Sequence, residues 1–536
     1  MPTIIVNDLE IEIGPDEQLN GIQAAQRAGV EIPHYCWHPG LSVVASCRMC
    51  LVETGRRDSE SGEISLVPEL VPACQTPATD GTVLVTDSQK VIDARAMVEE
   101  DLLIQHPIDY PICDKAGECS LQDYHFEHGR EERRADINPF TSRRRSLGDT
   151  VTLFVDRCVM CSLCVRFCRE ITETNELIVI NRGTAEEIDV LPGFPLENKM
   201  SGNVVDLCPV GALGDKDFLY EQRVWLINKR SHVCSGCSTG CSISVEENQD
   251  QIYRLKPRDN PHINHWWMCD EGRYGWKHVH HADRQVQAYR QDSETPTPLD
   301  SSTLVEQLQQ QLSEAGSLAA VLSPHSTVEE AYLLAQYVRS IDEQAQLILG
   351  HVPVKGDDET YPGGFTIRAE KCPNRRGVEE VIAGIAGQVT GWETFLESLA
   401  ESPPGGIWIT GGYKSDWHDE ATVNHFQHVP LIIVQDTFSS PLSQAATYNL
   451  PATTFAEQAG SFVNHADHLQ SFEQAIRPPA GVVPAGQLVW RLLNRPGLYQ
   501  SQVVLAEIAR EILYFNVAVE PPGELGVNLK LNHIAS

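Results

Sequence analysis

The chain has 536 residues, a length that implies about three to five domains, because domains usually hold about 100–200 residues. Its formal net charge is −33, which argues against nucleic acid or an anionic membrane as a direct partner, since both require clustered Lys and Arg. No apolar run reaches the roughly 18 residues of a spanning helix, and the first residues lack the basic and apolar segments of a signal peptide. These features predict a cytoplasmic protein without direct membrane insertion.

The sixteen cysteines are unevenly distributed along the chain. All but one lie between Cys36 and Cys269, and only Cys372 lies beyond them. In a cytoplasmic chain, cysteines grouped as C-x2-C indicate metal binding rather than disulfides. The sequence therefore predicts metal chemistry in the first half of the chain only.

The N-terminal region begins with two expected strands in residues 3–13, joined by a turn at Asn7-Asp8, and with a helix from about Asn20 to Ala28. A cysteine set with the spacing C-x10-C-x2-C-x23-C follows: Cys36, Cys47, Cys50 and Cys74. Hairpin, helix and cysteine loop resemble the β-grasp fold of plant-type [2Fe-2S] ferredoxins, in the variant found in respiratory and hydrogenase subunits. This resemblance predicts a [2Fe-2S] cluster, with zinc as the alternative.

The next region begins with a helix, predicted from Asp87 by apolar residues spaced three or four apart, which ends before Pro107. The loop that follows resembles a His-Cys-Cys-Cys [4Fe-4S] site with the family pattern H-x3-C-x2-C-x5-C. Three positions match this pattern: His106, Cys113 and Cys119. Tyr110 occupies the position of the first cysteine.

Tyr110 leaves the metal content of this loop open, because a phenol is a hard ligand with a high pKa, whereas iron in a sulfide cluster prefers thiolate. Four outcomes are compatible with the sequence. They are a cubane with Tyr110 or Asp109 as the fourth ligand, a cubane with an open iron, a three-iron cluster, and no cluster.

The third region follows an expected strand at Thr150–Phe154 and carries a C-x2-C-x2-C triplet with a distant Cys-Pro. The residues of this set are Cys158, Cys161, Cys164 and Cys208. A tight triplet closed by Cys-Pro is typical of a ferredoxin [4Fe-4S] cluster, whereas structural zinc sites more often use two separated pairs. Cys168 is the fifth thiol, and we expect it to be a buried bystander because no second triplet faces it.

A fourth set has the spacing C-x2-C-x3-C-x27-C and consists of Cys234, Cys237, Cys241 and Cys269. It resembles the [4Fe-4S] domain at the front of molybdopterin oxidoreductases. The nearby His278, His280 and His281 show no ligand spacing, so we interpret them as ordinary packing or surface residues.

Beyond about Pro296 helices alternate with short apolar strands, which predicts a mostly parallel, doubly wound sheet. Gly411-Gly412 follows one of these strands but is too weak a signal for a phosphate site. Residues 449–464 and 371–377 resemble segments of the molybdopterin-oxidoreductase family.

Taken together, these modules occur in this order in the large iron–sulfur subunit of NADH:quinone oxidoreductase, respiratory complex I. The resemblance implies an α+β multidomain fold: a β-grasp [2Fe-2S] ferredoxin domain, a His-Cys [4Fe-4S] loop domain, a [4Fe-4S] ferredoxin-like domain, a molybdopterin-oxidoreductase-type [4Fe-4S] domain and a shortened α/β region. The expected boundaries are residues 1–86, 87–146, 147–226, 227–283 and 284–536.

The resemblance also implies a function in electron transfer. Electrons would come from the flavin and NADH-binding subunit and pass towards quinone through one [2Fe-2S] and two to three [4Fe-4S] clusters, with no catalytic residue and no substrate site in this chain. The expected partners are the flavin subunit and the quinone-side iron–sulfur subunits, on the cytoplasmic face of the inner membrane.

Two other oxidoreductases share part of this module order. One is a soluble NAD-linked hydrogenase, of which this chain would be the iron–sulfur subunit. The other is a formate dehydrogenase, but the roughly 255 residues after His281 are too few for the domains that enclose a molybdopterin. We therefore expect no molybdopterin.

Overall fold

The computed structural model describes residues 2–132, 134–135, 137, 143–183, 185–292, 295–414 and 417–530. The chain divides into two compact units. The first contains Met1–Ile227 with Tyr361–Gly363, and the second contains Asn228–Thr360 with Gly364–Ser536. Among the described residues, no helix has both the length and the apolar character needed to cross a membrane.

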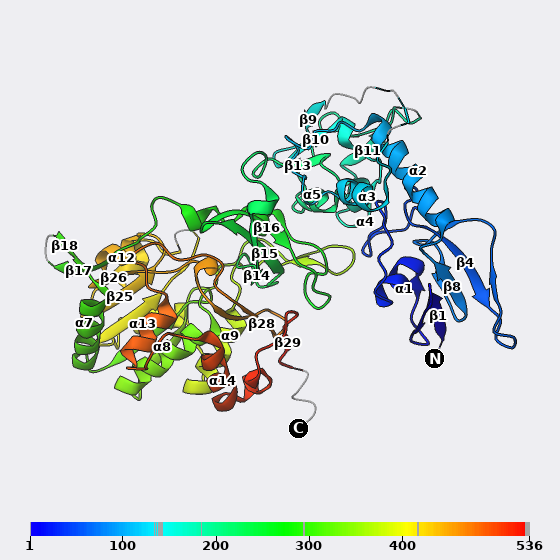
Figure 1. Ribbon diagram of the computed structural model, residues 1–536. Coiled ribbons are helices and arrows are strands. Elements are labelled where there is room, and N and C mark those ends of the chain that lie inside the picture. Colours follow the sequence, from blue (N-terminus) through cyan, green and yellow to red (C-terminus); the bar gives the residue numbers. More distant parts are fainter. Residues whose placement is uncertain are drawn as a thin grey trace. The chain divides into compact units, whose positions relative to one another are not determined.

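The first unit opens with a mixed sheet, blue in Figure 1, in the order β2-β1-β8-β4-β5, with β6 also paired to β4. Its strands are β1 (Thr3–Val6), β2 (Leu9–Glu12), β4 (Leu51–Arg57), β5 (Ile64–Leu66), β6 (Val71–Pro72) and β8 (Thr82–Val85). The expected turn between the first two strands forms, with Asn7 at a φ of 54°. Helix α1 (Gly21–Arg27) is capped by Asn20, which accepts a hydrogen bond from the Gln23 N–H at 3.0 Å. The helix packs its apolar side against the sheet.

The rest of the first unit is built from short elements around two loops rich in cysteine. Helix α2 (Gln89–Gln105) begins after Ser88 and ends at His106, its C-cap residue. The remaining elements are α3 (Ser120–His128), β9 (Arg144–Ser146), β10 (Val151–Phe154), α4 (Leu163–Glu170), β11 (Leu177–Ile180), β12 (Glu187–Val190), α5 (Asn203–Leu207) and β13 (Leu213–Asp215). Strand β10 pairs with β9 and β13 and precedes the cysteine triplet.

The second unit begins with an antiparallel sheet of β14 (Asn228–Val233), β15 (Ser242–Asn248) and β16 (Gln251–Pro257). The short helix α6 (Asp270–Tyr274) follows directly after Cys269, whose side chain caps it.

The larger part of the second unit is an eight-stranded sheet in the order β18-β17-β26-β25-β24-β19-β20-β23. Its strands are β17 (Ala288–Asp292), β18 (Thr295–Leu299), β19 (Leu318–Leu322), β20 (Gln346–Leu349), β23 (Thr390–Gly391), β24 (Gly406–Thr410), β25 (Leu431–Asp436) and β26 (Tyr448–Pro451). The six strands from β26 to β23 are parallel, as expected, because helices connect them. The hairpin of β17 and β18 adds an antiparallel edge that the sequence pattern does not indicate.

Helices cover both faces of this sheet. Helices α7 (Ser301–Glu314), α8 (Val328–Ile341), α9 (Arg375–Ala386), α13 (Ala485–Leu492) and α14 (Ser501–Glu511) contribute to one core, and α10 (Trp392–Ser398) and α12 (Pro441–Ala445) contribute to the other. Strand β19 contributes to both cores, because its side chains alternate between the two faces of the sheet. Ala320 and Leu322 belong to the first core, and Ala319 and Val321 belong to the second. Figure 1 shows α8, α13 and α14 together beside the sheet.

Candidate metal centres

The β-grasp domain brings the first cysteine set together. Cys36, Cys47 and Cys50 lie on the loop between α1 and β4, and Cys74 lies directly after β6. Since β6 pairs with β4, the Ala73 N–H donates to the Cys50 carbonyl at 2.9 Å, and this bond holds the last cysteine beside the loop. All four residues are buried or nearly so.

The four thiols of this set interact as two pairs. Cys47 donates to Cys36 and lowers the pKa of Cys36, while Cys74 donates to Cys50 and lowers the pKa of Cys50. The backbone N–H groups of Ser46 and Cys47 also donate to Cys36. Two facing pairs of thiols suit a centre with two irons, each bound by two thiolates.

The second complete set encloses a single cavity in the first unit. Cys158, Cys161, Cys164 and Cys208 all line it, together with apolar residues such as Leu153. Burial raises the pKa of Cys158 to about 12 and raises that of Cys161 and Cys164 further, so these thiols would ionise only with a bound cation. Helix α4 supplies Cys164 from its first turn, and Cys208 is the C-cap residue of α5.

Cys168 lies on the same helix as Cys164 and is fully buried. It is not among the residues that line the cavity. Burial and the nearby Glu176 raise its pKa to about 12. Its position is compatible with the expected role of a bystander.

The third complete set encloses a cavity in the second unit, where Cys234, Cys237, Cys241 and Cys269 share the lining with Phe365 and other residues. Burial raises the pKa of Cys234, and Lys414 opposes this increase. Lys371 lies near Cys237 and Cys269 and forms an ion pair with Glu271 at 2.7 Å. Two lysines therefore place positive charge beside these thiols.

In an iron–sulfur cluster each iron has its own protein ligands, so the thiols surround a volume rather than a point. The second and third complete sets each line a cavity, an arrangement that suits a cluster.

The His106 loop places its predicted residues in one buried region. Cys113 and Cys119 are both buried, and each thiol contributes to raising the pKa of Tyr110, in addition to burial of the phenol. Burial and the nearby Arg157 lower the pKa of His106 to about 4, so the imidazole is neutral and free to bind a metal. The phenol of Tyr110 thus lies near the two thiols.

Asp109 is engaged elsewhere. Its Oδ2 accepts hydrogen bonds from Arg157 Nε at 3.1 Å and Nη2 at 2.9 Å, and Arg157 is almost fully buried. Because this carboxylate already pairs with a buried guanidinium, ligation by Asp109 would break the pair. Of the two candidates for the fourth ligand, only Tyr110 has no hydrogen bond or ion pair with a described residue.

The sequence reasoning missed Glu99, a fully buried carboxyl on α2. Tyr35, the residue before Cys36, donates a short hydrogen bond to Glu99 Oε1, and Oε2 has no partner. Burial raises the pKa of Glu99 to about 7, and its charge contributes to the raised pKa of Tyr110. Glu99 therefore lies between the first cysteine set and the His106 loop.

Arg166 on α4 was also missed. It is 1 % exposed, and its guanidinium donates hydrogen bonds to the carbonyl oxygens of Ser42, Cys36 and Cys161. One side chain thus joins the loop of the first set to that of the second. A charged residue inside an otherwise apolar helical turn is the signal that could have indicated this role, because buried charges need partners.

The second set and the His106 loop are in direct contact. The Ser120 N–H donates to the Pro209 carbonyl at 2.9 Å, next to Cys208. At Gly211 an added Cβ would lie only 2.2 Å from Cys113 Sγ. Glycine is therefore required at this position for the two loops to approach this closely.

We predict that Gly211→Ala lowers the free energy of unfolding by about 1–3 kcal/mol, because the extra methyl group overlaps a buried sulfur. Denaturant unfolding of the metal-loaded protein measures this change. Gly391→Ala is the matched control, since no atom lies within 4 Å of a Cβ at Gly391. Equal stability of the two variants would contradict the close approach of the loops.

Family models match five stretches of the chain, which include the three complete cysteine sets and the His106 loop. They are a 2Fe-2S iron-sulfur cluster binding domain over residues 3–89, the NADH-ubiquinone oxidoreductase-G iron-sulfur binding region over 95–134 and the NADH-quinone oxidoreductase subunit 3 ferredoxin-like domain over 148–214. The molybdopterin oxidoreductase Fe4S4 domain follows over 230–281, and the molybdopterin oxidoreductase model matches 377–482. The expected α+β multidomain fold and module order are confirmed.

Curated relatives share one name, which identifies them as the G-type subunit of NADH-quinone oxidoreductase. The chain is 36% identical to the protein of Rickettsia prowazekii over 274 residues, which are 51% of this chain and 39% of the relative. Identity to the protein of Salmonella typhimurium is 31% over 339 residues, 63% of this chain and 37% of the relative. Identity to the protein of Pseudomonas fluorescens is 32% over 347 residues, which are 63% of this chain and 36% of the relative. The chain thus spans well under half the length of these relatives.

Among solved structures, a chain of an NAD+-reducing [NiFe]-hydrogenase matches at 27% identity, covering 42% of this chain and 91% of that chain, with a TM-score of 0.34. A score this low supports no structural argument. The matches to sequence relatives and to four successive iron–sulfur family models do not depend on this solved structure. By sequence and by module order, the chain is similar to the G-type subunit of NADH-quinone oxidoreductase.

Proposed function

We propose that this chain is an electron-transfer iron–sulfur subunit of an NADH:quinone oxidoreductase, which relays electrons from a flavin subunit towards quinone. The observation that carries the proposal is the contact between successive ligand sets in the first unit. Arg166 bonds to the carbonyl oxygens of Cys36 and Cys161, and Gly211 touches Cys113. Centres in contact through their ligand loops suit electron tunnelling.

The proposed cofactors are one [2Fe-2S] cluster and two or three [4Fe-4S] clusters, which carry electrons one at a time. The proposed ligands of the [2Fe-2S] cluster are Cys36, Cys47, Cys50 and Cys74. Those of the two complete [4Fe-4S] sites are Cys158, Cys161, Cys164 and Cys208 in the first unit and Cys234, Cys237, Cys241 and Cys269 in the second. His106, Cys113 and Cys119 would hold a third cubane, with Tyr110 at the fourth position. We propose no molybdopterin and no catalytic residue in this chain.

The proposed order in the first unit is the first cysteine set, then the Cys158 set, then the His106 loop. The residues of the chain hold the clusters, exclude water and set the potentials through hydrogen bonds to sulfur. Met160 provides one such bond, because its N–H lies 3.4 Å from Cys158 Sγ. In the second unit, the Gly236 N–H lies 3.4 Å from Cys234 Sγ and the Gly272 N–H lies 3.3 Å from Cys269 Sγ.

The five domains proposed for the chain keep the boundaries given above. The proposed partners are the flavin and NADH-binding subunit and the quinone-side iron–sulfur subunits, with the chain bound through them to the cytoplasmic face of the inner membrane. The soluble NAD-linked hydrogenase is the second candidate, and formate dehydrogenase is the third.

Purification of the tagged chain from its own cells tests this assignment. We expect a flavin subunit and membrane-embedded subunits to co-purify, and NADH to bleach the iron–sulfur absorbance of the complex. Recovery with nickel-containing hydrogenase subunits, or with bound molybdenum, would support the second or the third candidate and contradict the first.

A further inference from the structure

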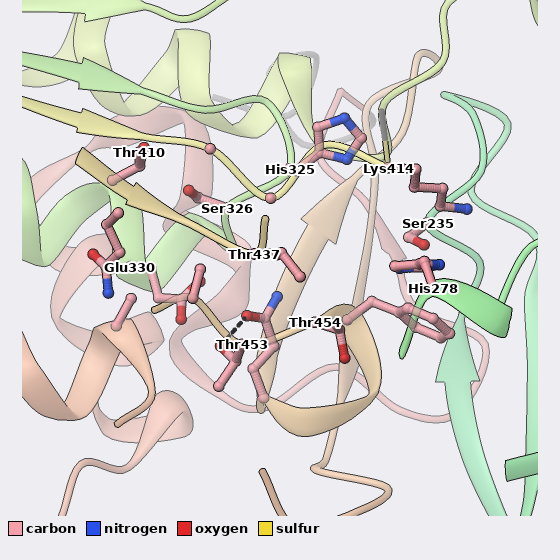
Figure 2. Close-up of a pocket in the computed structure, with 17 residues that line it drawn as sticks. Ser235, His278, His325, Ser326, Glu330, Thr410, Lys414, Thr437, Thr453 and Thr454 are labelled. Carbon is pink, nitrogen blue, oxygen red and sulfur yellow. Dashed lines mark hydrogen bonds between the residues drawn. The ribbon is translucent and has the colours of Figure 1, made fainter. Parts of the chain in front are cut away.

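The second unit contains a pocket that the electron-transfer role does not use. It lies where β24 and β25 end, beside the loops that follow β19 and β26, and its lining includes His278, His325 and Lys414 (Figure 2). In the sheet, β19 lies between β20 and β24. After β19 the chain passes through α8 to β20 on one side of β19, and it later returns to form β24 on the other side. Such a change of direction at the carboxyl ends of parallel strands leaves a crevice in which α/β proteins bind ligands.

Two buried side chains in this pocket have a hydrogen-bond donor with no acceptor among the described residues. Gln435 is 2 % exposed, and its Nε2 makes no hydrogen bond. Thr454 is 4 % exposed, and its hydroxyl donates to no group. Native proteins rarely leave buried donors unpaired, so two in one pocket indicate an acceptor-bearing ligand. Thr453, by contrast, donates to Gln458 Oε1 at 3.1 Å, the bond drawn in Figure 2.

The pocket lining also includes one lysine, Lys414, which lies near Cys234 as well. Lys414 forms no ion pair with any described residue, and it lies near His278 and His325, whose pKa values it helps to lower, after burial, to about 4 and about 3. Both imidazoles are therefore neutral, and Lys414 is the cation of this end. In Figure 2, Lys414, Ser235 and His278 lie together on one side of the pocket.

The carboxyl groups near the pocket do not neutralise Lys414. Glu330 lies on the opposite side in Figure 2, and its carboxylate accepts a hydrogen bond from the Thr327 N–H at 3.1 Å. Asp436 does not line the pocket, and its carboxylate accepts from the Gly412 N–H at 2.9 Å and from Trp417 Nε1 at 3.0 Å. Among the described residues, no carboxylate forms an ion pair with Lys414 at this end of the pocket.

The space in the pocket limits the size of the ligand. The cavity volume is about 50 Å³, enough for about four water molecules at roughly 10–15 Å³ each. A single small ion fits this space, whereas a nucleotide does not.

We propose that this pocket binds a small, acceptor-rich anion, with Lys414 supplying the charge and Gln435 and Thr454 supplying hydrogen bonds. Inorganic phosphate and short organic acids share this chemistry. Gly411 and Gly412 form the pocket wall at the end of β24. A side chain does not fit at Gly411, because an added Cβ would lie 2.2 Å from the Asp436 carboxyl carbon. The inference stands on the second unit alone and does not depend on the proposed electron transfer.

Calorimetric titration of the metal-loaded full chain, in a buffer free of both anions, tests the site with inorganic phosphate in one arm and acetate in the other. We expect at least one of them to bind and to raise the melting temperature. Tighter binding of phosphate identifies a phosphate-type anion, and tighter binding of acetate identifies a carboxylate. Failure of both to bind at millimolar concentration would overturn the proposal.

Three variants make the test specific. Lys414→Ala, Gln435→Leu and Thr454→Val should each weaken binding about tenfold or more. Without anion, Gln435→Leu should keep or raise the melting temperature, because it removes an unpaired buried amide; a purely structural role predicts a decrease. Lys355→Ala, at an exposed lysine of the same unit, is the control and should bind as the unmodified protein does. Unchanged affinity in all three pocket variants would overturn the assignment.

Discussion

Cys164→Ala is expected to remove an entire [4Fe-4S] cluster, a loss of about four irons and four sulfides per chain. Cys164 is buried, lines the cavity of its set and sits in the first turn of α4. With only three thiols left, one buried corner of the site has no ligand. Iron and acid-labile sulfide analysis of the purified variant measures the loss.

Cys168→Ala is the matched control for this prediction, because the two cysteines lie one helical turn apart on α4 and both are buried. Cys168 does not line the cavity, so its variant should keep the full iron content. A loss of iron in Cys168→Ala, or full iron in Cys164→Ala, would show that the ligands have been assigned wrongly.

Arg166→Met should lower the free energy of unfolding of the first unit by about 3 kcal/mol or more. The substitution keeps much of the side-chain volume but leaves three carbonyl oxygens without their donor, and each unpaired buried acceptor costs about 1–3 kcal/mol. Because these carbonyls belong to Ser42, Cys36 and Cys161, both ligand loops should loosen. Denaturant unfolding, followed by loss of the iron–sulfur absorbance, measures the change.

Arg169→Met provides the comparison on the same helix. Arg169 is exposed and, among the described residues, pairs only with its neighbour Glu170, so its loss should change stability by about 0.5 kcal/mol at most. If Arg166→Met were as stable as Arg169→Met, the guanidinium would not connect the two loops.

Much of the fold could be predicted from local patterns. The periodicity of α2 and the capping of α1 by Asn20 depend on residues within a few positions of one another, so one sequence suffices to find them. The parallel sheet followed from helices between apolar strands. The Pro-rich hairpin partner β18 was missed because Thr295–Leu299 lacks the apolar alternation of a strand, and its edge position is what tolerates proline.

The candidate ligands could be proposed from spacing, because cluster chemistry requires thiolates at short intervals. The residues around them could not. Arg166 acts on Ser42 and Cys36, 124 and 130 positions away, and Gly211 matters only because Cys113 lies against it. The unpaired amide of Gln435 is visible only once its surroundings are known.

We propose that the first half of this chain holds a series of iron–sulfur clusters. Electron paramagnetic resonance of the reduced protein, together with iron and sulfide counts, is the direct test. We predict signals of one [2Fe-2S] and two [4Fe-4S] clusters with about ten irons per chain, rising to about fourteen if the Tyr110 site holds a third cubane. A colourless protein that contains zinc and no iron would contradict the account.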